Sequence, residues 1–496
     1  MCINRFQYVV TKESPLEEQF NRKNTTYIVK QTIDLHGITI VMPKGCRIVF
    51  ENEGTIVNGT IILENTELDG AKNLECKVEG IIKNDTIQTS WFKSFSNTTL
   101  EYSNKVILFD HDENVTKSIL LFNCKHAVFN GNSHAINNIG CDLFQIEGDC
   151  SDIEVKFFKT DGDGKQMFFG GNSTNGIKEN IKIHHNVIND QRVGISLNAD
   201  LAGSYLNCSI HDNVISNIIG EETGHGYGIH LANVNNTDIS NNIIDNCERH
   251  AIYHAWGENN IIQGNTIRNH RKNTQFAIRA ALAIFRNSCY VKIQDNTFEN
   301  NHSVDVHFYT GVDSQSSYSH RRYGDQRGNI VCNNTFIHDE LLNSKECIGI
   351  MVGYNVLPYD DYRYYINNLK IEGNRFTYTT TNAPNCIRIY YCDKLEILNN
   401  EFQFDNSVSG DLVNFSSKYK QNTENKWFFE GNIIVAKNSF RIPINIIYIS
   451  PDWYENQGGV TIEVNGNSLV NNKNGETYNY RLYSNQKKVS ALKQRD

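Results

Sequence analysis

From residue 183 onward, the hydrophobic and polar positions of the chain follow one repeated pattern. An aliphatic residue is followed by two variable positions, an asparagine, one variable position and a large apolar residue. Successive copies lie roughly 23 to 40 residues apart, the spacing of a supersecondary unit that is stacked many times. The pattern therefore predicts a solenoid. The repeated asparagines are Asn186, Asn213, Asn242, Asn265, Asn296, Asn334, Asn374, Asn400, Asn438 and Asn467.

The apolar stretches within each copy indicate strands. They are short, rich in Ile, Val and Phe, and broken by Asn-Asn or Gly-Asn pairs, whereas a helix needs a 3.6-residue period sustained over a dozen positions. In the copy around Asn242 we expect strands at Gly228–Ala232, Thr237–Ser240 and Ile243–Asp245, with a turn at 233–236. Three short parallel strands per coil predict an all-β fold, a right-handed parallel β-helix.

The repeated asparagine is expected to be structural. Asparagine tolerates positive φ, so we place each copy at a sharp bend between two strands. Coils stacked about 4.8 Å apart would also let the amides hydrogen-bond to one another along the axis. With such an asparagine ladder, the sequence resembles the pectate-lyase-like superfamily, whose coils carry the ladder between their second and third strands. The resemblance implies an architecture, and one fold hosts many activities.

We divide the chain into four regions: an arm or cap (1–26), an opening module (27–95), the main β-helix with its groove loops (96–470), and a tail or cap (471–496). The opening region contains Thr26-Tyr27-Ile28-Val29, Leu35-His36-Gly37, Pro43-Lys44-Gly45-Cys46, Val57-Asn58-Gly59-Thr60 and a closing Trp91-Phe92 pair. It is similar to the opening module of many β-helix proteins of gut Bacteroidales and their phages. That resemblance implies a carbohydrate-active or tail-associated protein.

Composition narrows the class of partner. A formal net charge of −9 and a pI near 6.0 argue against nucleic acid. No stretch approaches the roughly 18 apolar residues of a membrane span, and the start of the chain has no apolar run of signal-peptide length. The 13 cysteines are an odd number without metal-type spacing, so we expect free, buried thiols. An extracellular or virion-associated location without a visible Sec signal is expected.

Strand alternation identifies the side chains that would line a substrate groove. In this superfamily substrates lie along the outer face of the first strand of each coil. If Ile229 and Leu231 point inward, His230 points outward, and Tyr253 is its neighbour in the next coil. By the same alternation we expect Asp305, His307, Tyr309 and Arg388 on the groove side. The loops Glu221–Gly226, Arg271–Phe276, Gly311–Arg327 and Val356–Tyr365 would border it.

These residues suit the recognition and cleavage of an acidic polysaccharide. Arginine can hold and neutralise a uronate carboxylate, which acidifies the C5 proton; a histidine or tyrosine can then remove that proton while another protonates the leaving oxygen. The expected reaction is β-elimination without a cofactor. The catalytic candidates are His230, Tyr253, Arg249 and His307; the substrate-binding candidates are His225, His250, His254, Trp256, Arg279, Arg286, Tyr309 and Arg388. The inward parity of His254 favours a core role for that residue, and Trp256 could either stack on a sugar or cover the core.

Three other interpretations stay open. A glycoside hydrolase needs two carboxyl groups. Carboxyl groups are present at Glu221, Glu222, Glu248, Glu258 and Asp305, but their spacing in the sequence does not identify a catalytic pair. The Gly224-His225-Gly226 tripeptide is similar to that of polygalacturonases, but their preceding Asp-Asp pair is missing. A tail fibre or adhesin would bind a glycan without cutting it, and a spacer would do neither. The lysine and Arg-His-Gly-Asn pattern of chondroitinase B and alginate lyases is absent.

The sequence also bears on the oligomeric state and on bound ions. The opening module would suit a tail-associated depolymerase, for which a homotrimer is the expected assembly. A Ca²⁺ ion at Asp161 and Asp163 is conceivable, but no metal site is predicted.

Overall fold

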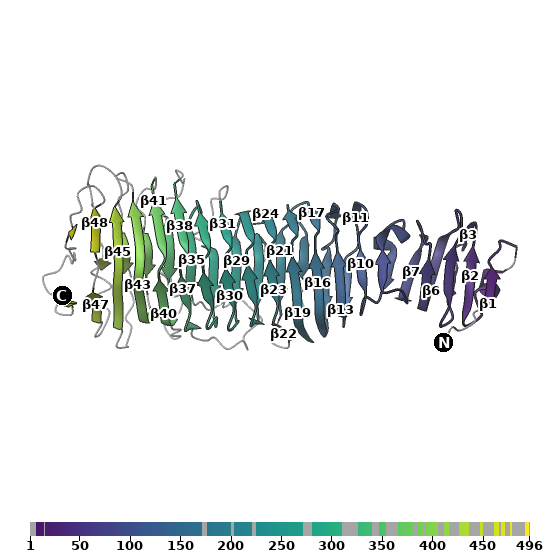
Figure 1. Ribbon diagram of the computed structural model, residues 1–496, viewed down its shortest axis with the longest axis horizontal. Helices are drawn as coiled ribbons and strands as arrows, with labels where there is room; N and C mark the ends of the chain where they lie inside the picture. Colours follow the sequence, from purple (N-terminus) through teal and green to yellow (C-terminus); the bar gives the residue numbers. More distant parts are fainter. Residues whose placement is uncertain are drawn as a thin grey trace.

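The computed structural model shows a long stack of parallel strands with the chain termini at opposite ends (Figure 1). The structure describes residues 6–13, 15–170, 176–199, 203–220, 225–270, 280–309, 326–339, 347–353, 366–379, 385–390, 392–404, 411–415, 426–435, 447–449, 461–465, 468–471, 477–478 and 492–495. Equivalent positions of successive coils pair in register, as in the row Ile210, Ile239 and Ile262. The fold is a right-handed parallel β-helix, which confirms the sequence-based prediction.

One sheet runs along the outer face that sequence analysis assigns to the groove, and we call it the groove sheet. Its strands among the described residues are β12 (Ile119–Phe122), β15 (Phe144–Glu147), β18 (Met167–Gly170), β21 (Val193–Asn198), β25 (Tyr227–Ala232), β29 (His250–Ala255), β32 (Ala280–Phe285), β35 (Val304–Tyr309), β39 (Ile348–Val352), β42 (Asn385–Ile389), β44 (Asp411–Phe415) and β46 (Ile447–Ile449).

The remaining strands of each coil form the ladder side of the helix. The strands before the corner that holds the ladder asparagine from Asn186 onward are β13 (Lys125–Asn130), β16 (Cys150–Lys156), β19 (Gly176–His184), β22 (Gly203–Leu206), β23 (Ser209–His211), β26 (Val234–Asn235), β27 (Asp238–Ser240), β30 (Ile261–Gln263), β33 (Lys292–Gln294), β36 (Gln326–Arg327), β37 (Ile330–Cys332) and β40 (Ile366–Glu372). Those after it are β17 (Lys159–Asp161), β20 (Val187–Asn189), β24 (Val214–Ile218), β28 (Ile243–Cys247), β31 (Thr266–Arg268), β34 (Thr297–Glu299), β38 (Thr335–His338) and β41 (Arg375–Tyr378).

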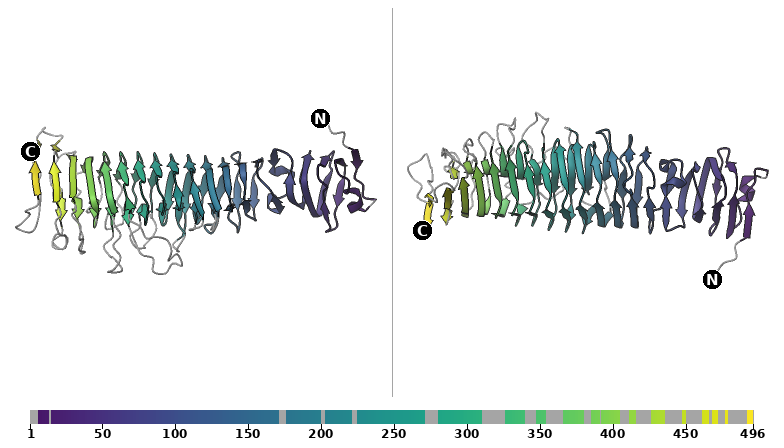
Figure 2. Two further views of the ribbon diagram at one scale, coloured as in Figure 1. Left: turned by 90° about the horizontal axis from the view of Figure 1, so that it is seen from below. Right: turned by 45° about the horizontal axis from the view of Figure 1, so that its top comes forward.

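The two ends of the stack continue the parallel pairing, except that β48 and β49 pair antiparallel, and Figure 2 shows the stack from two further sides. The N-terminal elements are β1 (Phe6–Val9), α1 (Leu16–Gln19), β2 (Thr25–Val29), β3 (Thr32–Asp34), β4 (Thr39–Val41), β5 (Arg47–Phe50), β6 (Thr55–Asp69), β7 (Glu75–Ile82), β8 (Thr86–Gln88), two 3₁₀ turns (Thr89–Trp91 and Phe95–Asn97), β9 (Thr98–Leu100), β10 (Val106–Leu108), β11 (Glu113–Val115) and β14 (Ile136–Asn138). The C-terminal strands are β43 (Asp393–Phe404), β45 (Lys426–Val435), β47 (Thr461–Asn465), β48 (Ser468–Asn471), β49 (Thr477–Tyr478) and β50 (Leu492–Arg495).

The asparagine ladder is continuous from Asn186 to Asn400. Each side-chain Nδ2 donates to the Oδ1 of the next asparagine at 2.9 Å, through Asn213, Asn242, Asn265, Asn296, Asn334 and Asn374. Each Oδ1 from Asn213 to Asn400 also accepts the backbone N–H of the preceding ladder residue, as in the 3.0 Å bond from Asn213 to Asn242. The ladder is thus confirmed over this span. Asn438 and Asn467 lie outside the described residues.

The expected backbone conformation of the ladder asparagines is wrong by one position. The residue before each asparagine takes the positive φ, as at Asp212 (φ 54°), Asn241 (φ 55°) and Gly264 (φ 62°). These residues tolerate the left-handed region best. The ladder side chain can therefore lie inside the corner, where Asn242 is 0% exposed, while its neighbour turns the chain.

The apolar positions beside the ladder fill the core. Phe298, Phe336, Phe376 and Phe402 stack coil upon coil, with ring centroids 4.6 to 5.0 Å apart. The cysteines of the described residues are all free, and all but Cys141 are buried, as the composition suggests. No helix in the described part of the chain is both long and apolar enough to span a membrane.

Candidate functional site

A single row of outward positions crosses the groove sheet and carries the predicted site. Adjacent strands pair Ser196 with His230, His230 with Tyr253 and, through Ala283, Tyr253 with His307. The flanking Ile229 and Leu231 are 0% exposed and His230 is half-buried. The predicted parity of β25 and the adjacency of His230 and Tyr253 are therefore confirmed.

His230 and Tyr253 lie in ring contact. Their centroids are 5.3 Å apart, and Tyr227, at the start of β25, stacks on His230 at 5.0 Å and approaches Tyr253 at 5.4 Å. The Nδ1 of His230 is 3.2 Å from the Ser196 hydroxyl, a hydrogen bond that orients the imidazole. An imidazole and a phenol thus share one patch of the groove sheet.

Two guanidinium groups act electrostatically on the Tyr253 hydroxyl. Burial raises the pKa of Tyr253 well above its ordinary value, and Tyr309 and Tyr227 act in the same direction, whereas Arg286 and Arg249 lower it. Arg249 lies over the Tyr227 ring, with Cζ 5.0 Å from the centroid. The phenol therefore keeps its proton at neutral pH.

The chain leaves the groove sheet through a row of positive-φ corners. Asn233 (φ 57°) occupies this corner after β25, but Trp256 (φ 51°) follows β29 and Arg286 (φ 52°) follows β32. Large side chains are disfavoured in this conformation, and such strain gathers at functional sites. The Arg286 Cζ lies 4.4 Å from the Trp256 ring centroid and 4.6 Å from that of Phe285. Trp256 remains half-buried at the edge of the groove sheet.

An aromatic strip continues from Tyr253 toward the next coils. Tyr253 contacts Phe285 at 6.0 Å, Phe285 stacks on Tyr309 at 4.3 Å, and Tyr309 stacks on His307 at 4.5 Å. His307 is 4% exposed, and its Nε2 donates to the Gly353 carbonyl at 2.8 Å. Burial lowers the pKa of His307 to about 4. It lies two strand spacings from Tyr253, about 10 Å at the usual spacing, so it does not join the His230–Tyr253 pair.

Two histidines predicted to bind substrate are interior residues. His254 is 0% exposed, its Nδ1 bonds to Ser288 Oγ at 2.8 Å and its Nε2 to Asn260 Nδ2 at 2.7 Å. Burial lowers the pKa of His254 to about 4, so the ring is neutral. His250 is 4% exposed and its Nδ1 donates to the Ala280 carbonyl. Direct substrate contact is wrong for His254 and is not supported for His250, which stacks beneath Tyr227 at 5.6 Å.

The expected groove orientation of Asp305 is also wrong. Asp305 is 1% exposed, accepts a hydrogen bond from Asn301 at 2.9 Å, and pairs with the buried His338 at 2.8 Å. Burial alone would lower the pKa of His338, but the Asp305 carboxylate outweighs burial and raises it to about 10. Asp305 therefore holds a core ion pair and cannot serve as one of two carboxyl groups for hydrolysis.

The other predicted residues are spread more widely. The Nε2 of His225 lies 3.3 Å from Arg192 Nη1, before the start of β25. Arg388 is in the outward row, four strands beyond Tyr253, so about 19 Å separate them at the usual spacing. Arg279 and most residues of the four predicted groove loops lie outside the described residues.

Sequence reasoning missed Tyr227, Phe285 and Ser196 as parts of the site. Alternation gives Tyr227 the inward parity of Ile229, yet its ring contacts both His230 and Tyr253. Phe285 was identifiable as the position that pairs with Tyr309 in the repeat register. For metals, the described residues contain one group of three histidine, cysteine or acidic ligands close enough to share an ion, and neither Asp161 nor Asp163 belongs to it.

No protein-family profile and no curated protein sequence matches the chain. Solved structures similar to it include a mutant tailspike protein of E. coli bacteriophage HK620 in complex with a pentasaccharide (11% identity, TM-score 0.40, covering 74% of this chain and 59% of the tailspike). Others are the catalytic unit of a GH87 α-1,3-glucanase from Streptomyces thermodiastaticus (11%, 0.39, 74% and 63%) and the Streptococcus pneumoniae adhesin PfbA (10%, 0.37, 88% and 94%). The chain spans less than two thirds of the first two proteins. At these identities the likeness concerns the fold alone.

Proposed function

We propose that the protein binds an acidic polysaccharide along the groove sheet and cleaves it by β-elimination at His230 and Tyr253. The observation that carries the proposal is the contact of these two rings in the outward row, with Arg249 over Tyr227 and Arg286 over Trp256 and Phe285 in the same part of the groove sheet. A uronate carboxylate placed against the guanidinium groups would be neutralised, which makes its C5 proton more acidic.

The two rings differ in the proton each would move. Tyr253 is neutral because burial raises its pKa, so it suits the acid that protonates the leaving O4. His230 then serves as the base: with Nδ1–H donating to Ser196 Oγ, its Nε2 accepts the C5 proton. The C5–H and C4–O bonds break and a C4=C5 double bond forms. Proton return from His230 to Tyr253 restores the enzyme.

The aromatic strip supports a polymeric substrate. Tyr253, Phe285 and Tyr309 follow one another across three strands of the groove sheet, about 10 Å at the usual spacing. Sugar rings stack readily on aromatic side chains, and this length corresponds to about two pyranose units. Trp256, held under Arg286, would add a stacking face at the edge.

The test is an assay with a panel of uronate-containing polysaccharides, following the ultraviolet absorbance of the unsaturated product. We expect Tyr253→Phe and His230→Gln each to lower the rate about 100-fold or more, because each removes one proton-transfer group. Tyr290→Phe is the matched control, since Tyr290 is 46% exposed and outside the aromatic strip. Absorbance that persists in Tyr253→Phe at the wild-type rate would exclude the proposed acid.

The second candidate is a glycan-binding protein without a reaction, such as a tail fibre or adhesin. It is favoured by the burial of His250, His254 and His307, which leaves His230 as the half-exposed imidazole in contact with Tyr253. Glycan retention without new absorbance or new reducing ends would support it. New reducing ends without absorbance would instead indicate a hydrolase. Under either function the opening module suits a tail-associated depolymerase or surface protein, and a homotrimer is the assembly to test by mass in solution.

A further inference from the structure

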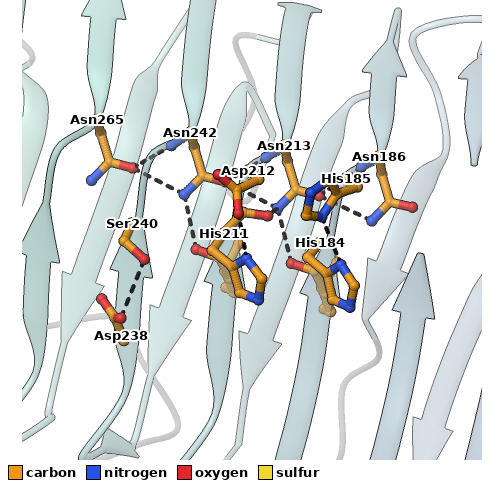
Figure 3. A network of polar contacts seen from close by, with 12 residues as sticks. His184, His185, Asn186, His211, Asp212, Asn213, Asp238, Ser240, Asn242 and Asn265 are labelled. Carbon is orange, nitrogen blue, oxygen red and sulfur yellow. Dashed lines mark hydrogen bonds and ion pairs between the residues drawn. The ribbon is translucent and has the colours of Figure 1, made fainter. Parts of the chain in front are cut away.

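Three histidines from two adjacent coils meet on the ladder side of the helix, away from the strands of the groove sheet. His184 ends β19, His211 ends β23, and these two positions pair in the parallel register. His185 is the corner residue that follows His184. Figure 3 shows the three imidazoles beside the ladder residues Asn186 and Asn213. We call this group the histidine cluster.

The ring nitrogens of the histidine cluster are close enough for one metal ion. One ligand nitrogen from each residue lies within 4.8 Å of the other two. The Nδ1 atoms of His184 and His185 are 2.8 Å apart, so at most one of them carries a proton in that contact. Nitrogens around a tetrahedral zinc ion, with bonds of about 2.0–2.1 Å, lie about 3.4 Å apart. The 2.8 Å contact and the upper limit of 4.8 Å are compatible with this value after small side-chain movements.

The two strand-end histidines, His184 and His211, each have one ring nitrogen within hydrogen-bond distance of a carboxylate oxygen. The Nε2 of His184 lies 2.9 Å from Glu154 Oε1, and the Nδ1 of His211 lies 2.7 Å from Asp212 Oδ2. Metal-bound histidines usually donate their second N–H to a carboxylate in this way, which fixes the tautomer and makes the ligand nitrogen more basic. These bonds leave His184 Nδ1 and His211 Nε2 as the nitrogens that would face an ion.

The histidine cluster is accessible and needs only a small rearrangement. The side chains of His184 and His211 are 13% and 29% exposed, and His185 is an exposed residue. The rings of His184 and His211 are stacked 4.7 Å apart at 6°. Imidazole lone pairs lie in the ring plane, so a shared ion requires one ring to turn. His211 can do this about χ2, a torsion with a broad, shallow preference.

His185 occupies a corner at which the chain turns with positive φ. Its φ is 55°, and the following coils place Asp212, Asn241 and Gly264 at this corner. Histidine, like asparagine and aspartate, is found in this region more often than other side chains. The corner therefore tolerates an imidazole, and the Nδ1 of His185 lies beside that of His184.

We propose that His184, His185 and His211 form a binding site for a divalent transition-metal ion of the zinc type, joining two coils of the helix. Imidazole ligands suit zinc, copper and nickel, and three of them leave a fourth position for water. The site is independent of the proposed polysaccharide cleavage, because its strands belong to the ladder side.

The test is direct titration of the full, chelator-treated chain with Zn²⁺ by calorimetry, supported by the visible absorption of bound Co²⁺. We expect one ion per chain and a rise in melting temperature with free Zn²⁺. His185→Asn and His211→Ser should each weaken binding about tenfold or more. These replacements copy the following coils, which carry Asn241 and Ser240 at the equivalent positions.

A matched control separates this site from general binding to surface histidines. His126 also has a positive φ (54°) and also faces a carboxylate, with Nδ1 3.1 Å from Asp152 Oδ2, but it is not part of the histidine cluster. His126→Asn should bind Zn²⁺ like the wild type. The metal-free melting temperature of His185→Asn should equal or exceed that of the wild type, which distinguishes loss of a ligand from unfolding. Absence of binding by the wild type, or equal affinity in His185→Asn, would overturn the proposal.

Discussion

Replacing one ladder asparagine should destabilise the coils around it. Asn242 is 0% exposed; its Nδ2 donates to the Ile210 carbonyl at 2.9 Å, and its Oδ1 accepts the backbone N–H of Asn213 at 3.0 Å. Asn242→Ala removes these two bonds and also the two ladder bonds to Asn213 and Asn265. The buried Ile210 carbonyl and the buried N–H of Asn213 then lose their bond to Asn242. The side-chain amide of Asn213 keeps its bonds to the Ile183 and His211 carbonyls.

The magnitude follows from the two backbone groups that lose their bond to Asn242. Each buried group without a partner costs about 1–3 kcal/mol, so the loss should be about 2–6 kcal/mol. Asn242→Asp separates hydrogen bonding from volume, because it keeps the shape but places an oxygen where Nδ2 donates. We expect it to be destabilising as well. Asn137→Ala is the control, since the two hydrogen bonds of Asn137 are exposed and water can replace them.

Hydrogen exchange followed by mass spectrometry is the suitable assay, because stability in a solenoid is local to neighbouring coils. Peptides that contain the Asn213 amide should exchange about 30-fold faster or more in Asn242→Ala, the factor that corresponds to a loss of about 2 kcal/mol. Peptides of the opening module should not change. If Asn242→Ala loses no more protection than Asn137→Ala, or if Asn242→Asp behaves like the wild type, then the ladder contributes through shape and not through its hydrogen bonds.

Three further predictions concern buried charge and strain. Burial lowers the pKa of His254 and that of His307 to about 4. The free energy of unfolding should therefore be highest above pH 6.5 and should fall as the pH drops toward 4, by up to about 3 kcal/mol for each ring. His254→Gln should make the melting temperature less dependent on pH in this acidic range. Asp305→Asn or His338→Gln should each cost about 3–5 kcal/mol in chemical denaturation, and the double variant less than the sum, because one change alone leaves the other group unpaired. Trp256→Asn should raise the melting temperature by relieving a positive φ and weaken polysaccharide retention on affinity electrophoresis; unchanged retention would contradict a sugar-stacking role.

The fold could be predicted because the position of each residue relative to the repeated asparagine indicates which residues of successive coils pair. A fixed offset from the ladder asparagine defines both the inward aliphatic row and the strand pairing, and the structure reproduces both. The same register placed His230 beside Tyr253. The register did not predict which corner residue takes the positive φ. The buried ladder asparagine and the positive-φ residue are neighbours in the sequence, and asparagine is suited to both positions.

Strict alternation failed where the groove strands begin. Gly228 and Gly349 occupy the same row as Asp305, and a Cβ added at either would lie within 3 Å of interior side chains, Ile244 for Gly228 and Phe376 for Gly349. The row therefore points into the core although alternation assigns it to the surface. The glycines in this row were the available signal. They show why a carboxylate at Asp305 requires an ionised partner such as His338.

Both proposed sites include a positive-φ corner that is not filled by asparagine, aspartate or glycine. Positive-φ corners in this chain are mostly filled by Asn, Asp or Gly, the residues that adopt them with least strain. Trp256 and Arg286 occupy such corners at the edge of the groove sheet, and His185 occupies one on the ladder side. Because an asparagine would serve the turn better than a tryptophan or an arginine, the fold alone does not account for Trp256 and Arg286. The proposed sugar binding would account for these two side chains, whereas the proposed metal site at His185 rests on the distances between its ring nitrogens and those of its neighbours.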